Sequence, residues 1–268
     1  MAMEITSKFP VVFIGHGSPI NAIEANEFSL AWMKLGQTLQ PKAILVISAH
    51  WQTDGIKVTS GDHPQQIYDF YGFLDELYQF KYQVSGNVTL AKQTVDLLKP
   101  KFMSVLDNKW GIDHGAWSVL CRMFPKANIP VIQLSLDANL KPAEHWQVAE
   151  KLSHLRDAGI LILGSGNLVH NLGLVKWQAD GFDWADKFDQ QLQTLIVEGD
   201  FEKLINYQNL EDWQLAIPTN EHYLPLLYTL ALKGANEKIK FFTEKVTMGS
   251  ISMRSLIINQ CHNMSHDV

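Results

Sequence analysis

The chain of 268 residues has little cysteine, no excess of basic charge and no long apolar run. Cys121 and Cys261 are too few and too far apart for a disulfide framework or a thiolate metal site, which favours a reducing cytoplasm. The net charge of -6 argues against nucleic acid as a partner, because its binding proteins present a basic face. No apolar run approaches the ~20 residues that span a bilayer, and the N-terminus lacks the apolar segment of a secretory signal. We therefore expect a cytoplasmic protein with no membrane partner.

The composition is otherwise that of a globular chain, with 46% hydrophobic residues and ten histidines. The length is near the upper limit for one hydrophobic core, and no repeat, low-complexity tract or linker divides the chain. We predict a single domain over residues 1–268.

Short apolar runs alternate with helical patterns, which predicts an α/β fold with a mostly parallel central sheet flanked by helices. Strands are predicted over residues 10–14, 43–48, 56–59, 130–136 and 160–163. Helices are predicted over residues 25–39, 89–98, 116–124, 142–158, 184–197 and 225–233, and the tail at 240–258 is expected to supply closing strands.

Histidines follow several of these strands. His16 comes directly after the first strand, His50 follows the second, and His170 follows the strand at 160–163 through a Gly-Ser-Gly sequence. Ligands of open α/β sheets bind outside the carboxyl ends of the strands, so side chains at these ends can meet although they are distant in sequence.

Two more histidines, His114 and His222, stand at the starts of predicted helices. A helix N-terminus disfavours the imidazolium form, so these rings stay neutral and able to bind a metal or accept a proton. Nitrogen ligands suit Zn, Fe, Cu or Ni, so the ligand type does not select the metal. From the residues alone, a three-histidine metal site and a set of structural histidines both stay open.

Six short motifs follow one another along nearly the whole chain. They are GHGSP at 15–19, SAHW at 48–51, HPQQIYDFYGF at 63–73, WGIDHGAW at 110–117, GSGNLVHNL at 164–172 and EHYLPLLY at 221–228. In content and order they resemble the class III (LigB-type) extradiol ring-cleavage dioxygenases, and most closely the 4,5-DOPA extradiol dioxygenase-like group. The resemblance implies an α/β fold with a metal site at the carboxyl ends of the strands.

The resemblance also implies that His16, His50 and His222 hold one divalent metal ion. Fe(II) is expected for dioxygenase activity, and Zn(II) is an alternative occupant of the isolated protein because it binds imidazole more tightly. Many class III relatives use two histidines and one glutamate, so Glu221 is the alternative to His222 as third ligand.

The family reaction inserts both atoms of O2 into a catechol and opens the ring beside the diol. The partners implied are therefore a small aromatic diol and O2, for a monomer or small homo-oligomer. By similarity, His170 and His114 are the catalytic residues that face the substrate. We expect His170 to take a catechol proton and His114 to stabilise oxygen in the site, each contributing ~10² to 10⁴ in rate.

The segment from 63 to 73 is rich in aromatic residues that could stack on a flat catechol. We predict substrate contacts for His63, Tyr68 and Tyr71, with ordinary core and lid packing as the alternative. Relatives commonly have proline where this chain has Leu74, a difference that bears on loop rigidity and substrate preference.

Two other functions are compatible with the same fold. One is a zinc-bound hydrolase, and the other is a non-catalytic interaction protein, against which the presence of His114 and His170 argues. The remaining histidines are expected to serve surface roles, with His145 and His154 in the helix at 142–158 and His262 and His266 in a polar tail. Cys121 is expected to be a buried apolar side chain.

Overall fold

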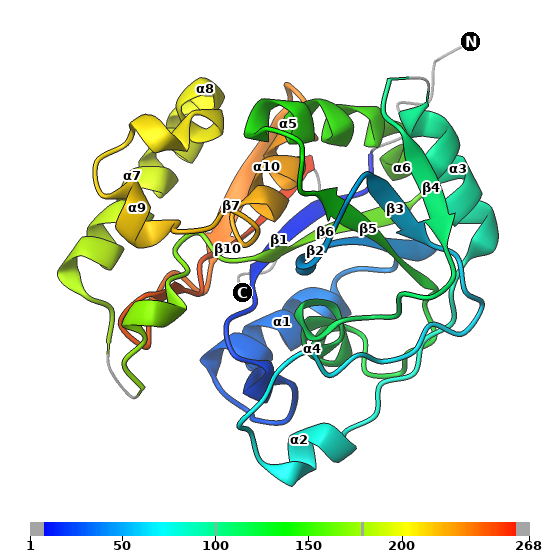
Figure 1. Cartoon of the computed structure of the whole chain (residues 1–268), viewed down its shortest axis with the longest axis horizontal. Coiled ribbons are helices and arrows are strands. Elements are labelled where there is room, and N and C mark those ends of the chain that lie inside the picture. Colours follow the sequence, from blue (N-terminus) through cyan, green and yellow to red (C-terminus); the bar gives the residue numbers. More distant parts are fainter. Residues whose placement is uncertain (1–7, 100, 178–179, 261–268) are drawn as a thin grey trace.

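The computed structural model describes residues 8–99, 101–177 and 180–260. Eight strands form one sheet in the order β4-β3-β5-β2-β6-β1-β10-β7 (Figure 1). Its strands are β1 (Val11–Gly15), β2 (Ala43–Thr53), β3 (Ile56–Thr59), β4 (Ser104–Asp107), β5 (Val131–Asp137), β6 (Ile160–Gly166), β7 (Glu237–Phe242) and β10 (Ser255–Gln260). The central strands β5, β2, β6 and β1 are parallel, and β10 and β7 extend the sheet antiparallel at one edge. A separate antiparallel pair joins β8 (Val246–Thr247) and β9 (Ile251–Ser252).

Helices cover both faces of this sheet. They are α1 (Glu27–Gln37), α2 (Asp75–Gln79), α3 (Val88–Leu98), α4 (His114–Met123), α5 (Pro142–Lys151), α6 (Ser153–Asp157), α7 (Asp183–Glu198), α8 (Phe201–Ile205), α9 (Trp213–Ala216) and α10 (Leu224–Ala231), with short 3-10 turns at Pro19–Ala22, Leu172–Leu174 and Tyr207–Asn209. Alternate residues of β1 point to opposite faces, so that Val11 and Phe13 pack with one apolar cluster and Val12 and Ile14 with the other. In Figure 1, α5 and α10 lie on one side of the sheet and α1 and α4 on the other.

The predicted α/β fold with a mostly parallel sheet and flanking helices is confirmed, and every predicted strand is present. Two predictions needed correction in extent. The strand at 43–48 continues to Thr53, which places His50 inside it, and the helix at 142–158 is divided into α5 and α6 at Leu152. The short elements α2, β4, α8 and α9 were not predicted, because each is too short to show a hydrophobic period.

The prediction of a surface role for His145 is wrong. Its side chain is fully buried on α5, and its Nδ1 is 3.0 Å from the hydroxyl of Tyr228 on α10. The partner lies 83 positions away in the chain, so the local helical pattern carries no sign of it. His154 is exposed and Cys121 is buried, as predicted, whereas His262 and His266 lie outside the described residues.

Helices that combine enough length and apolarity to cross a membrane are absent from residues 8–99, 101–177 and 180–260.

Candidate active site

The register of three parallel strands places two histidines side by side. Ile14 of β1 and Ser48 of β2 are both paired with Ser165 of β6. His16 and His50 each come two residues later, His16 directly after β1 and His50 within the extended end of β2. Because β1 and β2 flank β6, both histidines stand at the carboxyl end of β6. The pairing of β2 with β5 shifts register in the segment that contains His50, and such bulges change the direction of side chains.

His222 reaches the same place from the segment before α10. Its carbonyl oxygen accepts a hydrogen bond from the backbone N–H of Asn167 at 2.9 Å, which ties this segment to the end of β6. Gly166 makes the close approach possible, because a Cβ there would lie 2.0 Å from the same carbonyl oxygen. A side chain at Gly166 would therefore displace the backbone of His222.

The structure brings five histidines together, and we call them the histidine cluster: His16, His50, His114, His170 and His222. The rings of His16, His50 and His222 form a nearly equilateral triangle, with centroid separations of 5.1, 5.3 and 5.0 Å. His170 stacks on His222 at 3.4 Å, and His114 lies 3.9 Å from His50. The histidines of five of the six motifs therefore converge in one place.

The tautomer of His16 follows from its hydrogen bonds. Its Nδ1 lies 3.0 Å from the Ser165 hydroxyl, and that hydroxyl donates its hydrogen to the carbonyl oxygen of Gly115. The Ser165 oxygen must therefore accept from the Nδ1–H of His16, which leaves Nε2 with its lone pair. This Nε2 lies 3.1 Å from the Nε2 of His50.

Carboxylates hold two more rings in the same way. The Nδ1 of His50 lies 3.2 Å from Asp69 Oδ2, and the Nδ1 of His222 lies 3.1 Å from Glu221 Oε1. Histidines that bind metals commonly have their second ring nitrogen fixed by a carboxylate or another hydrogen-bonding group. The placement of Glu221 beside Nδ1 gives it this orienting position relative to His222.

Asp69 contacts two members of the histidine cluster and was not singled out from the sequence. In addition to His50, its Oδ1 accepts from the backbone N–H of His114 at 2.9 Å and lies 3.0 Å from that residue's Nδ1. The signal available was an acidic residue in the middle of the aromatic motif at 63–73. Its geometry depends on a loop contact 45 residues apart, which no local pattern reveals.

Burial and mutual proximity keep most of these rings neutral. Burial, then the neighbouring charges of His50 and His114, lowers the pKa of His170 to about 3. Burial likewise lowers the pKa of His16 and of His222 well below the ordinary value. For His50, burial alone would lower the pKa, but the hydrogen bond with Asp69 and nearby carboxylates raise it.

The donor set fits one divalent metal ion. Nitrogens bound to one ion at about 2.1 Å each lie about 3.0 to 3.4 Å apart, and the Nε2 atoms of His16 and His50 have a separation of that size. Nitrogens of His114 also come within 4.8 Å of these two, while His170, Glu221 and His222 form a second group of the same spacing. The nitrogen distances therefore group His114 with His16 and His50, and His222 with His170 and Glu221. The ring centroids of His16, His50 and His222 are the more evenly spaced set, and the role of His222 as third ligand stays a prediction.

A cavity of about 740 Å³ opens onto the histidine cluster. Tyr71 and Asp69 line this cavity, and the substrate contact expected of Tyr71 stays a prediction. His63 is exposed and is not among the residues that line it. Tyr68 is also outside the lining, because its hydroxyl donates to the carbonyl oxygen of Phe80 in the loop. The loop packing considered as an alternative accounts for Tyr68.

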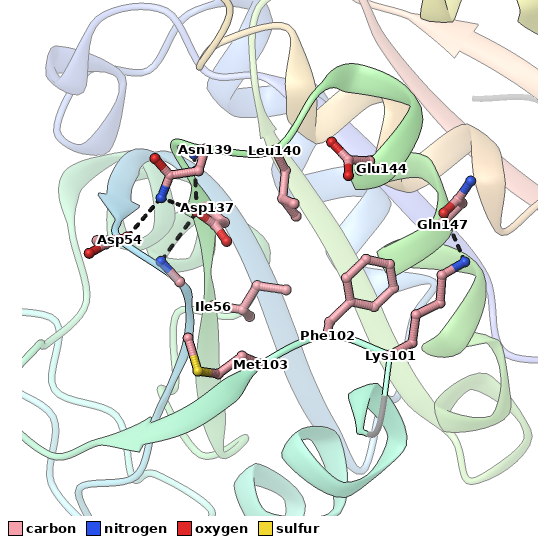
Figure 2. Close-up of a pocket in the computed structure, with 11 residues that line it drawn as sticks. Asp54, Ile56, Lys101, Phe102, Met103, Asp137, Asn139, Leu140, Glu144 and Gln147 are labelled. Carbon is pink, nitrogen blue, oxygen red and sulfur yellow. Dashed lines mark hydrogen bonds between the residues drawn. The ribbon is translucent and has the colours of Figure 1, made fainter.

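A second hollow of about 340 Å³ lies between the β2–β3 turn and α5, and its lining includes no histidine of the described residues (Figure 2). Its polar groups bind one another: Asn139 donates to Asp54 at 2.7 Å and to Asp137 at 3.2 Å, and Lys101 donates to Gln147 at 2.8 Å. This internal pairing contrasts with the converging ring nitrogens of the histidine cluster, which is the stronger candidate for chemistry.

Comparison with known proteins gives a consistent result. Residues 13–256 match the family model described as the catalytic LigB subunit of aromatic ring-opening dioxygenase. A 4,5-DOPA dioxygenase extradiol of Escherichia coli K12 is 44% identical over 94% of this chain and 96% of its own length. The protein of the same name from Beta vulgaris is 40% identical over 91% and 94%. A crystal structure of an uncharacterized Escherichia coli K12 protein, 40% identical, superposes with a TM-score of 0.82 over 93% of this chain and 99% of that one.

Proposed function

The chain belongs to the family of catalytic LigB subunits of aromatic ring-opening dioxygenases and is a ring-cleaving dioxygenase, and we propose that it is a metal-dependent extradiol enzyme acting on catechols. L-DOPA is the first substrate to test, because relatives that cover more than nine-tenths of the chain are named for it. The observation that carries the proposal is the triangle of His16, His50 and His222, each with its Nδ1 held by a hydrogen-bonding partner.

In the proposed reaction, O2 adds to the catechol and the ring carbon–carbon bond beside the diol breaks. Both oxygen atoms stay in the product. Held by His16, His50 and His222, a divalent ion would supply the positive charge that favours the catecholate and open positions for the diol and O2.

The other side chains of the histidine cluster have separate tasks in this proposal. His170 lines the cavity and stacks on His222, which supports its proposed task of accepting a catechol proton. His114 lines the same cavity from the first turn of α4, where Asp69 accepts a hydrogen bond from its backbone N–H and lies 3.0 Å from its Nδ1. It is the candidate to stabilise oxygen on the other side of the substrate.

Reconstitution tests the proposal directly. The protein is stripped of metal, reloaded with Fe(II) without air, and mixed with L-DOPA and oxygen. We expect a yellow ring-opened product, with one O2 consumed for each catechol. A zinc-loaded sample is the control and should form none, because zinc has no redox chemistry. An iron-loaded protein that consumes no O2 with any catechol would contradict the proposal and favour the hydrolase or interaction-protein alternative.

A further inference from the structure

The part of the cavity away from the histidine cluster is apolar. Its lining there is formed by Ile20, Phe70, Tyr71, Phe73, Leu74, Leu172, Val175, Trp177, Met248 and Ile251. No lysine or arginine is among the lining residues of the described chain, and the residues outside the described ranges include neither type. Asp69, the carboxylate that lines the cavity, lies 3.2 Å from the Nδ1 of His50 and 3.0 Å from that of His114.

Four large side chains at this cavity are exposed to solvent, and we call them the apolar rim. The exposed fractions are 92% for Tyr71, 70% for Leu74, 70% for Leu172 and 66% for Trp177. They come from two segments far apart in sequence, the aromatic loop after β3 and the segment after β6. Exposed apolar side chains gathered at one cavity are typical of a ligand-binding surface rather than of scattered surface residues.

Building on the proposed function, we propose that the preferred substrate is a catechol whose substituent is uncharged and apolar, bound by the apolar rim. The substituent of L-DOPA carries a carboxylate and an ammonium group. Among the described residues, the lining offers the carboxylate no cationic side chain of lysine or arginine and only neutral donors such as the Tyr71 hydroxyl and the Trp177 indole N–H, so the loss of its hydration is compensated only in part. An alkyl group has no hydrogen bonds with water to lose, so its transfer from water to the apolar part of the cavity is favourable.

A substrate series tests this preference. The iron-loaded protein is assayed with 4-methyl-, 4-propyl- and 4-butylcatechol, with 3-(3,4-dihydroxyphenyl)propanoate and with L-DOPA. Affinities for the same compounds are measured by calorimetry without oxygen. We expect kcat/KM to rise about fourfold for each added methylene that becomes buried. Butylcatechol should exceed L-DOPA at least tenfold in kcat/KM and in affinity.

The outcomes separate this inference from the proposed function. If L-DOPA is cleaved and bound as well as butylcatechol, the apolar preference is wrong and the dioxygenase function stands. If no catechol is cleaved but butylcatechol still binds more tightly than L-DOPA, the preference stands and the proposed function falls.

A charge placed on the rim provides the sharper test. Leu172→Lys should raise kcat/KM for L-DOPA and the propanoate about tenfold and lower it for butylcatechol by a similar factor. The matched control is Leu174→Lys, because Leu174 belongs to the same 3-10 turn and is exposed but does not line the cavity. Equal shifts in both variants, or none in either, would overturn the assignment of Leu172.

The exposed Lys176 provides a second check, since it stands between two residues that line the cavity. We expect Lys176→Gln to change kcat/KM for L-DOPA less than twofold. A selective loss for L-DOPA of tenfold or more would show that Lys176 binds the carboxylate, and would overturn the proposal.

Discussion

The histidine cluster and the apolar rim line the same cavity but are built in different ways. The cluster combines side chains from the carboxyl ends of buried strands with His114 of α4 and His222 before α10, and hydrogen bonds and carboxylates hold three of its rings. The rim consists of exposed side chains on two loop segments. The sheet and its neighbouring segments thus fix the positions where precise geometry is needed for chemistry. Loops carry the contacts that can differ between substrates, and we therefore expect changes in the two regions to affect different kinetic constants.

The largest effect should come from removing a metal ligand. His222→Ala is expected to lose the metal and to reduce kcat/KM at least about 10⁴-fold, because two histidines bind a divalent ion much more weakly than three. His114→Ala should keep one metal per chain and lose about 10² to 10⁴-fold in kcat, the range for a general acid–base group. The number of metal ions per chain, measured after gel filtration, distinguishes the two variants. The reverse result would assign the third ligand to His114, whose nitrogens also lie close to those of His16 and His50.

His170→Ala should lower the rate of catalysis without lowering the metal content of the cluster. We expect kcat to fall about 10² to 10⁴-fold, because no other group replaces the proposed proton acceptor. The metal content should stay at one per chain. Loss of the metal in this variant would show that the ring stacked on His222 is a ligand or is needed to keep the site formed.

Asp69→Asn tests a residue that acts through two histidines rather than on the substrate. The carboxylate contacts the Nδ1 atoms of His50 and His114, so the amide should weaken metal affinity or lower kcat about 10- to 100-fold. Metal affinity is measured by competition with a chelator. Asp62→Asn is the matched control, since Asp62 is exposed and lies in the same loop. Equal losses in both variants would indicate a general effect on the loop.

The difference between the cluster and the loops also explains what the sequence could predict. The central strands are continuous apolar runs because both faces are buried, and the histidines that follow them could be placed at one sheet edge. β4 was missed because its Val105 and Leu106 are half exposed, so it has no buried run. Asp69 was missed because its role depends on contacts made by an irregular loop. The helical pattern of the sequence also did not indicate that His145 is buried.

His145 shows what burial does to a histidine outside the cluster. Burial lowers its pKa to about 4, from 6.5 in the unfolded chain. Between these values the unfolded state binds more protons, so folding stability is lost as the pH falls. The loss attributable to this residue should reach about 2 kcal/mol at pH 5 and be absent at pH 7. Urea unfolding of the wild-type protein and His145→Gln at both pH values measures it, and a stability difference independent of pH would contradict the assignment.

The smallest effect should come from the rim. Trp177→Ala is expected to raise KM for butylcatechol about fivefold, because the indole loses its contact with the alkyl group, while kcat falls less than twofold. Leu174→Ala, outside the cavity, should change neither constant. Steady-state kinetics with the iron-loaded protein gives both values. A loss in kcat comparable to that of His170→Ala would place Trp177 in the catalytic machinery and remove the distinction between the two regions. A change confined to KM would instead show that substitutions in the apolar rim alter the preference among catechols without affecting the chemistry of the histidine cluster.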